Sequence, residues 1–382
     1  MNMKDNKNDK LITLAILTYS KAQTLQNVLQ SEGIEAVISN VNQIQPVISS
    51  GVRVRIKESD LPQALAIIES SAWLSEDVIE DKDPVLDSKV DKVLIPVDFS
   101  DYSTKACEIG FSLAAALSAE VILLHVYYTP MYAAIFPYSD FSYQATDEVV
   151  AAKNIIVKAR QEINKLSDQI KEKIDNKELP KVSFSAILRE GIPEEEILRY
   201  AKEQRIKIVI MGTRGKNQKD LDLIGSVTAE VIDRSRAAVL ALPEKTPFKS
   251  IDEINNIAFI TNFDQRDLIA FDSLIKNIIK SLSVKITLLR LADEKDTWDE
   301  IKLGGIKEYF KKQYPTLDIK YDIIKNDDIL QNLEEYIVSN KIDMITLASY
   351  KRNVFSRLFN PSIARKMIFH ADTPLLVIHT KK

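Results

Sequence analysis

The chain has 382 residues, enough for two or three domains, and its hydrophobic content of 45% and charged content of 28% are ordinary for a globular protein. A formal net charge of −4 gives no reason to expect nucleic acid or an anionic membrane as a partner. The single cysteine, Cys107, excludes an internal disulfide framework and fits a reducing compartment. No apolar run approaches the length of a membrane span, and the first residues lack a signal-peptide core, so we expect a cytoplasmic protein.

Residues 10–71 predict a small α+β domain. We expect strands at 11–17, 34–38 and 52–56, and helices at 21–31 and after Ser59-Asp60, a typical N-cap. The stretches VLQSEGIEAVI, at 28–38, and VRVRIKESDLPQALAII, at 52–68, resemble a short bacterial domain family named for signal transduction. The resemblance carries no catalytic motif.

Residues 72–90 form an acidic stretch around Pro84. Its carboxylates are Glu76, Asp77, Glu80, Asp81, Asp83 and Asp87. The composition predicts a flexible linker between two domains. An interaction tail is the alternative that remains open.

Residues 91–245 alternate strands with helices. Strands are expected at 93–97, 121–126, 182–188, 208–211 and 239–242. Ser100 or Asp101 caps the first helix, a long helix covers about 146–175, and Pro193 opens another helix after Gly191-Ile192. This alternation predicts a parallel sheet with right-handed crossovers.

Residues 254–382 repeat the same plan. Strands are expected at 257–260, 285–291, 319–324, 344–348 and 375–379. The apolar texts at 208–211 and 239–242 match those at 344–347 and 375–378. The sequence therefore predicts an internal repeat of roughly 130–150 residues.

Residues 211–228, called the glycine loop below, contain three of the nine glycines of the chain. Gly212, Gly215 and Gly225 lie between an apolar strand and a helical pattern, and Ser226 follows the last of them. Such a loop lets backbone N–H groups approach an anion at a helix N-terminus. The spacing fits neither a P-loop nor a dinucleotide fingerprint. From the spacing alone, a phosphate site and a plain turn are equally good interpretations of the glycine loop.

The second copy lacks the residues that make the glycine loop distinctive. An ungapped comparison pairs Gly212 with Ala348, Gly215 with Lys351, Gly225 with Pro361, Asp98 with Asn262 and Pro96 with Ile260. Side chains at these positions block close backbone approach, and proline offers no N–H group. If the first copy binds phosphate, we expect the second copy to be a scaffold without a ligand.

Four segments of the first copy resemble the universal stress protein family. They are VLIPVDFSDYSTKA, AEVILLHV, EGIPEEEILRYAKE and IVIMGTRGKNQKDLDLIGSVTAEVIDRSRAAVLAL. The glycine loop resembles that of the ATP-binding branch of the family. The resemblance implies two tandem five-stranded doubly wound sheets of order 3-2-1-4-5, with the ligand at the switch point beside strands 1 and 4.

The resemblance also implies site residues. Asp98 and the backbone near Pro96 and Val126 would hold adenine and ribose. The remaining cofactor-binding candidates, around the phosphates, are Met211, Gly212, Arg214, Gly215, Gly225, Ser226, Val227 and Thr228. The expected cofactor is ATP, AMP or another adenine nucleotide, with Mg²⁺ as a further candidate beside it. Asp220 and Asp222 depart from a phosphate-binding loop, because they would repel a triphosphate if they faced it.

Other chemistry finds little support. The histidines His125, His370 and His379 have no partners at metal-ligand spacing, and no residues are predicted to be catalytic. The aromatic-rich residues 127–143 are either a lid or a packing surface. We expect a nucleotide-dependent stress-response regulator. The resemblance implies that the last strands of the repeats, at 239–242 and 375–378, pair as a pseudo-dimer, because the family pairs through its last strand. Slow ATP hydrolysis, homodimerisation and an unknown protein partner stay open, and a nucleotide-independent adaptor is the alternative.

Overall fold

A computed structural model describes residues 11–17, 19–40, 52–61, 63, 64, 67, 91–128, 144–214, 226–279, 283–291, 297–324, 329–349 and 373–380. The N-terminal unit contains a three-stranded antiparallel sheet of order β1-β3-β2, and α1 packs on it. Its elements are β1 (Leu11–Leu17), α1 (Tyr19–Ser31), β2 (Val37–Asn40), β3 (Val52–Lys57) and the 3₁₀ helix η2 (Glu58–Asp60).

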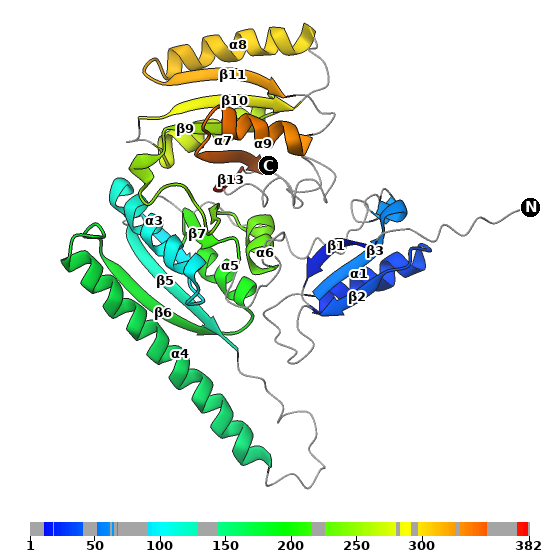
Figure 1. The fold of residues 1–382 in the computed structure, drawn as a ribbon, viewed down its shortest axis with the longest axis vertical. Coiled ribbons are helices and arrows are strands. Elements are labelled where there is room, and N and C mark those ends of the chain that lie inside the picture. Colours follow the sequence, from blue (N-terminus) through cyan, green and yellow to red (C-terminus); the bar gives the residue numbers. More distant parts are fainter. Residues whose placement is uncertain are drawn as a thin grey trace, which may run out of the picture.

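The rest of the described chain is built on a ten-stranded sheet of order β11-β10-β9-β12-β13-β8-β7-β4-β5-β6 (Figure 1). The strands of its first half are β4 (Lys92–Pro96), β5 (Glu120–Tyr127), β6 (Phe184–Glu190), β7 (Ile208–Gly212) and β8 (Ala238–Leu242). Those of its second half are β9 (Asn256–Ile260), β10 (Lys285–Leu291), β11 (Asp318–Ile324), β12 (Met344–Ser349) and β13 (Leu375–His379).

Each half of the sheet has the same strand order. Numbered within its own half, each runs 3-2-1-4-5, and all pairs within a half are parallel. The halves meet where β13 pairs antiparallel with β8, through Leu375–Ala241, Leu376–Leu240 and Val377–Val239. The sheet is therefore mixed but dominated by parallel pairs, and the last strands of the two halves form its centre.

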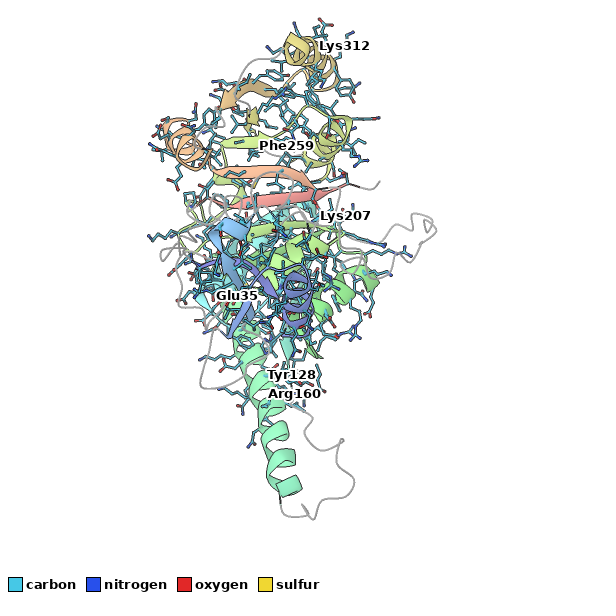
Figure 2. The ribbon with its side chains drawn as sticks, turned by 90° about the vertical axis from the view of Figure 1, so that its right-hand side faces the viewer. Glu35, Tyr128, Arg160, Lys207, Phe259 and Lys312 are labelled. Atoms are coloured by element: carbon cyan, nitrogen blue, oxygen red, sulfur yellow. The ribbon has the colours of Figure 1, made fainter. Side chains whose placement is uncertain are left out.

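Helices cover both faces of the sheet, which the side view in Figure 2 shows around Phe259. One face carries α3 (Asp101–Leu117), α4 (Gln144–Asp175), α7 (Gln265–Asn277) and α8 (Thr297–Gln313). The other carries α5 (Pro193–Glu203), α6 (Ser226–Arg234) and α9 (Ile329–Ser339). Successive strand residues serve opposite faces, so Val93 and Ile95 join one core while Leu94 joins the other. The start of α4 extends beyond Arg160, away from the sheet.

Most element predictions agree with the structure. The long helix expected at 146–175 is α4, Ser100 is the N-cap of α3, and Pro193 is the first residue of α5. Cys107 is buried. The strand expected at 34–38 lies later, at β2. Residues 72–90 lie outside the described part of the chain. In the part that the structure describes, no helix is long and apolar enough to cross a membrane.

One described helix, α8, was not predicted. Gly304 and Gly305 lie in its middle, and glycine weakens a helix interior by about 1 kcal/mol relative to alanine. The helix is held instead by packing, because Ile306 and Phe310 are buried in the core of the sheet. Tertiary contacts thus override a poor local propensity.

Candidate functional site

A tight turn follows β4 and fixes the position of Asp98. The Asp98 Oδ1 atom accepts hydrogen bonds from the Ser100 backbone N–H, at 3.1 Å, and from the Ser100 hydroxyl. Phe99 between them has a φ of 62°, in the left-handed region. Ser100 then caps α3 by accepting a hydrogen bond from the Ser103 N–H. One carboxylate oxygen of Asp98 therefore shapes the turn, and the side chain is held at the carboxyl end of β4.

His125, at the end of β5, packs on this turn. Its ring lies 4.4 Å from that of Phe99, and its Nδ1 atom lies 2.7 Å from the carbonyl oxygen of Val97. A carbonyl can only accept, so Nδ1 carries the proton. Burial is the main cause that lowers the pKa of His125, which favours the neutral ring. His125 thus packs at the end of a strand.

The end of β7 packs closely against the start of α3. A Cβ atom added to Gly212 would lie 2.5 Å from the Cβ atom of Tyr102. Glycine is therefore required here by packing, whether or not a ligand binds. The Thr228 hydroxyl, in the first turn of α6, donates a 2.8 Å hydrogen bond to the Gly212 carbonyl. This bond ties together the two ends of the glycine loop and leaves Thr228 only its backbone N–H for an anion.

Arg214 is directed toward α3 in this structure. Its Nη1 atom donates to the Tyr102 hydroxyl at 3.4 Å, and that hydroxyl donates to Glu244 Oε2 at 3.1 Å. The chain of contacts links the glycine loop, the first turn of α3 and the segment after β8. Tyr102 and Glu244 could not be identified from the sequence, because neither belongs to a motif and only tertiary packing brings them together.

The other predicted site residues divide into core residues and residues outside the described part. The Met211 side chain is 4% exposed, and Val126 and Val227 pack against the same core cluster. Pro96 is buried at the end of β4. Only backbone groups of these residues could serve a ligand. Gly215 and Gly225 lie outside the described residues, as do Asp220 and Asp222.

The structure brings the two strand ends together. β4 and β7 are neighbours in the sheet, and α3 and α6 begin just beyond them. Helix N-termini carry unpaired N–H groups and a partial positive charge, so this edge suits an anionic ligand. Among the residues with described positions, no group of three or more His, Cys, Asp or Glu side chains could hold a metal ion.

The matching turn of the second half has the same backbone but different chemistry. Phe263 has a φ of 58°, and Asp264 caps α7 by accepting from the N–H groups of Arg266 and Asp267. The Asp267 carboxylate accepts from the Thr261 hydroxyl at 2.9 Å and from the Asn262 N–H at 2.7 Å. Burial is the main cause that raises the pKa of Asp267. The Asp267 carboxylate thus accepts hydrogen bonds from donors of its own turn.

This doubly wound sheet, with two helices starting at its switch point, defines the chain as an α/β protein with a mostly parallel sheet. The profile of the Universal stress protein family matches residues 89–243. A universal stress protein of Methanocaldococcus jannaschii is 35% identical over 159 residues, covering 40% of this chain and 95% of that protein. The chain belongs to the universal stress protein family.

Two further likenesses agree with this membership. A universal stress protein of Bacillus subtilis is 31% identical over 150 residues, covering 39% of this chain and 96% of that protein. The crystal structure of a universal stress protein from Archaeoglobus fulgidus matches 75% of this chain and 98% of its own, with a TM-score of 0.52 and 15% identity. The structural likeness thus extends over the fold of both halves of the sheet.

Proposed function

We propose that the first half of the sheet binds ATP, AMP or another adenine nucleotide, and that its occupancy regulates a stress response. The observation that carries this proposal is the meeting of Asp98 and Gly212 at the ends of β4 and β7, beside two helix N-termini. A carboxylate suits ribose hydroxyls, which are donors, and N–H groups at the start of α6 suit phosphates. Arg214, two residues after Gly212, supplies a cation, and Mg²⁺ would accompany a triphosphate.

We propose further that the second half, residues 254–382, is a tandem copy of the domain without the ligand. Its strand order equals that of the first half, and its turn keeps the left-handed phenylalanine. Asn262 replaces Asp98, and Ala348 replaces Gly212. On this proposal, residues 10–71 are a signal-transducing module and residues 72–90 the linker. Nucleotide occupancy alters the surface that a protein partner contacts, and this mechanism requires no catalytic residue.

Equilibrium titration with ATP and AMP tests the site. Asp98→Ala should weaken binding by about tenfold or more, because hydrogen bonds to a charged group contribute about 1.5–3 kcal/mol. Asn262→Ala, at the matching turn of the second half, is the control and should bind like the wild type. Equal affinities of the wild type and Asp98→Ala would rule out the assignment of Asp98.

A nucleotide-independent adaptor is the second candidate. The contact of Arg214 with Tyr102 favours it, since the cation expected at the phosphates points toward α3. The acidic residues Asp220 and Asp222 favour it as well. An adaptor should purify without a bound nucleotide by mass analysis and show no thermal shift with ATP, AMP or cyclic AMP. A copurifying adenine nucleotide would exclude it.

A further inference from the structure

Arg214 lies between two helices that can each attract its side chain. The Thr228 hydroxyl donates to the Gly212 carbonyl, so the first turn of α6 lies beside the end of β7, and Arg214 follows Gly212 by two residues. α3 packs on one face of the sheet and α6 on the other (Figure 1). From this position the guanidinium can point toward α3 or toward the N-terminus of α6, where the proposed phosphates would lie.

The structure directs Arg214 toward α3, where a tyrosine and a carboxylate meet it. The Arg214 Nη1 atom donates to the Tyr102 hydroxyl at 3.4 Å, and this hydroxyl donates to Glu244 Oε2 at 3.1 Å. A hydroxyl accepts one hydrogen bond while it donates another, so Tyr102 links the positive guanidinium to the negative carboxylate. The two charges lie on either side of one oxygen atom, within the Debye length of about 10 Å at 0.1 M salt, and therefore attract each other.

Glu244 belongs to the segment 243–255, which joins the two halves and is anchored on both sides of it. The Thr246 hydroxyl donates to the Pro243 carbonyl at 2.7 Å, and the Ile251 N–H donates to the Ser112 hydroxyl of α3 at 3.0 Å. The Glu244 side chain itself is exposed, so its attraction for a cation is weakened by solvent. Hydrogen bonds from arginine to phosphate are charge-assisted and often bidentate, so phosphates can displace this contact.

The second half does not reproduce this set of side chains. The ungapped comparison of the two copies pairs all three residues with other types: Arg266 for Tyr102, Tyr350 for Arg214 and Thr380 for Glu244. The second copy thus has no carboxylate at the position of Glu244. The negative charge occurs only in the copy for which we propose a ligand.

We propose that Tyr102 and Glu244 compete with the phosphates of the ligand for the Arg214 guanidinium, and thereby set how much the phosphates add to affinity. Both act through Arg214 and are positioning residues. A carboxylate beside a cation lowers the positive potential that a phosphate meets. This inference rests on the proposed function and deepens it, since it assigns two residues that tune the discrimination between a nucleotide and its nucleoside.

Titrations with ATP and with adenosine test the competition. Tyr102→Phe removes the hydroxyl and keeps the ring, and Glu244→Gln removes the charge. Each should raise ATP affinity by about twofold to fivefold, the scale of an exposed ion pair, and leave adenosine affinity unchanged. Both gains should vanish in the Arg214→Gln background. Asp252→Asn, which removes another exposed carboxylate from the segment 243–255, is the control and should bind ATP like the wild type.

A gain from Glu244→Gln that persists in the Arg214→Gln background would overturn the inference, because Glu244 would then repel the phosphates directly. Unchanged or weaker ATP binding by Tyr102→Phe would overturn it as well. In both cases the wild type still binds ATP, and the competition alone fails. A wild type that binds no adenine nucleotide would overturn the proposed function, and the competition with it.

Discussion

Gly212 shows that packing alone can require a glycine at a proposed binding site. Its missing side chain lets β7 approach Tyr102 on α3, and the same backbone lies at the end of the strand where we propose the ligand. A glycine in a binding motif is therefore no proof of binding. Variants must separate the two roles.

Gly212→Ala should destabilise the protein by about 1–3 kcal/mol, because the added methyl group overlaps Tyr102. Chemical denaturation measures the change, and a double-mutant cycle with Tyr102→Gly, which removes the overlapping Cβ atom, should recover part of it. Gly304→Ala is the matched control. Its Cβ atom meets open space on α8, so it should stabilise the protein by about 0.5–1 kcal/mol. A similar loss in Gly212→Ala with and without Tyr102 would contradict the packing explanation.

Some site residues could be predicted from the sequence and others could not. Asp98 was recognisable because a polar residue directly follows a buried strand, and Gly212 because glycines are rare in this chain. The roles of Tyr102 and Glu244 depend on tertiary packing, which leaves no local pattern. The sequence does contain a signal for Phe99, because the ungapped comparison of the two copies pairs it with Phe263, and both residues adopt a positive φ.

At the scale of elements, a buried histidine of one half lies beside a helix of the other. His379, in β13, is close to the backbone of Ile232 in α6, the helix that follows the glycine loop. Burial is the main cause that lowers the pKa of His379 from 6.5 to about 4. The ring is therefore neutral in the folded protein at neutral pH.

The lowered pKa predicts how stability depends on pH. Between about pH 4 and 6.5 the unfolded chain binds more protons at His379 than the folded chain, so stability rises with pH in this window. The contribution of neutral His379 to the free energy of unfolding is complete above pH 6.5. It is lost as the pH falls toward 4, and the loss is about 3 kcal/mol at most. Denaturant titrations at several pH values measure it.

His379→Gln should flatten this pH dependence, since glutamine does not titrate. His125, whose pKa is also lowered, adds a contribution of the same sign. The His125→Gln control should therefore retain the slope due to His379. If His379→Gln kept the wild-type slope, the protonation of His379 could not be its cause.

At the scale of the whole molecule, strand order followed from the alternation of strands and helices, since crossover rules leave few topologies for such a pattern. The joining of the halves into one sheet does not follow from that alternation. It was expected only from the resemblance to a family that pairs through its last strand. The pairing of β8 with β13 buries Leu376 completely, and Leu240 almost completely, at the centre of the sheet.

One continuous core on each face predicts cooperative unfolding of the two halves. Calorimetry of the wild type should show a single main transition for residues 91–380. Leu376 is 0% exposed, so Leu376→Asp places a charge in the core. This variant should either split the calorimetric transition into two or lower its midpoint temperature by several degrees. Val338→Asp, on α9 at 77% exposure, is the control and should leave the transition in place. Two well-separated transitions in the wild type would contradict this coupling.

The antiparallel pairing of β8 with β13 has a consequence for how such a protein can change. In a dimer of identical chains, every substitution occurs in both subunits, so a substitution that impairs a site impairs it in both copies. Here the partners belong to one chain, their association does not weaken on dilution, and each can vary alone. Position 262 can hold asparagine while position 98 holds aspartate. A covalent link thus permits asymmetry, with one half free to specialise as support for the other.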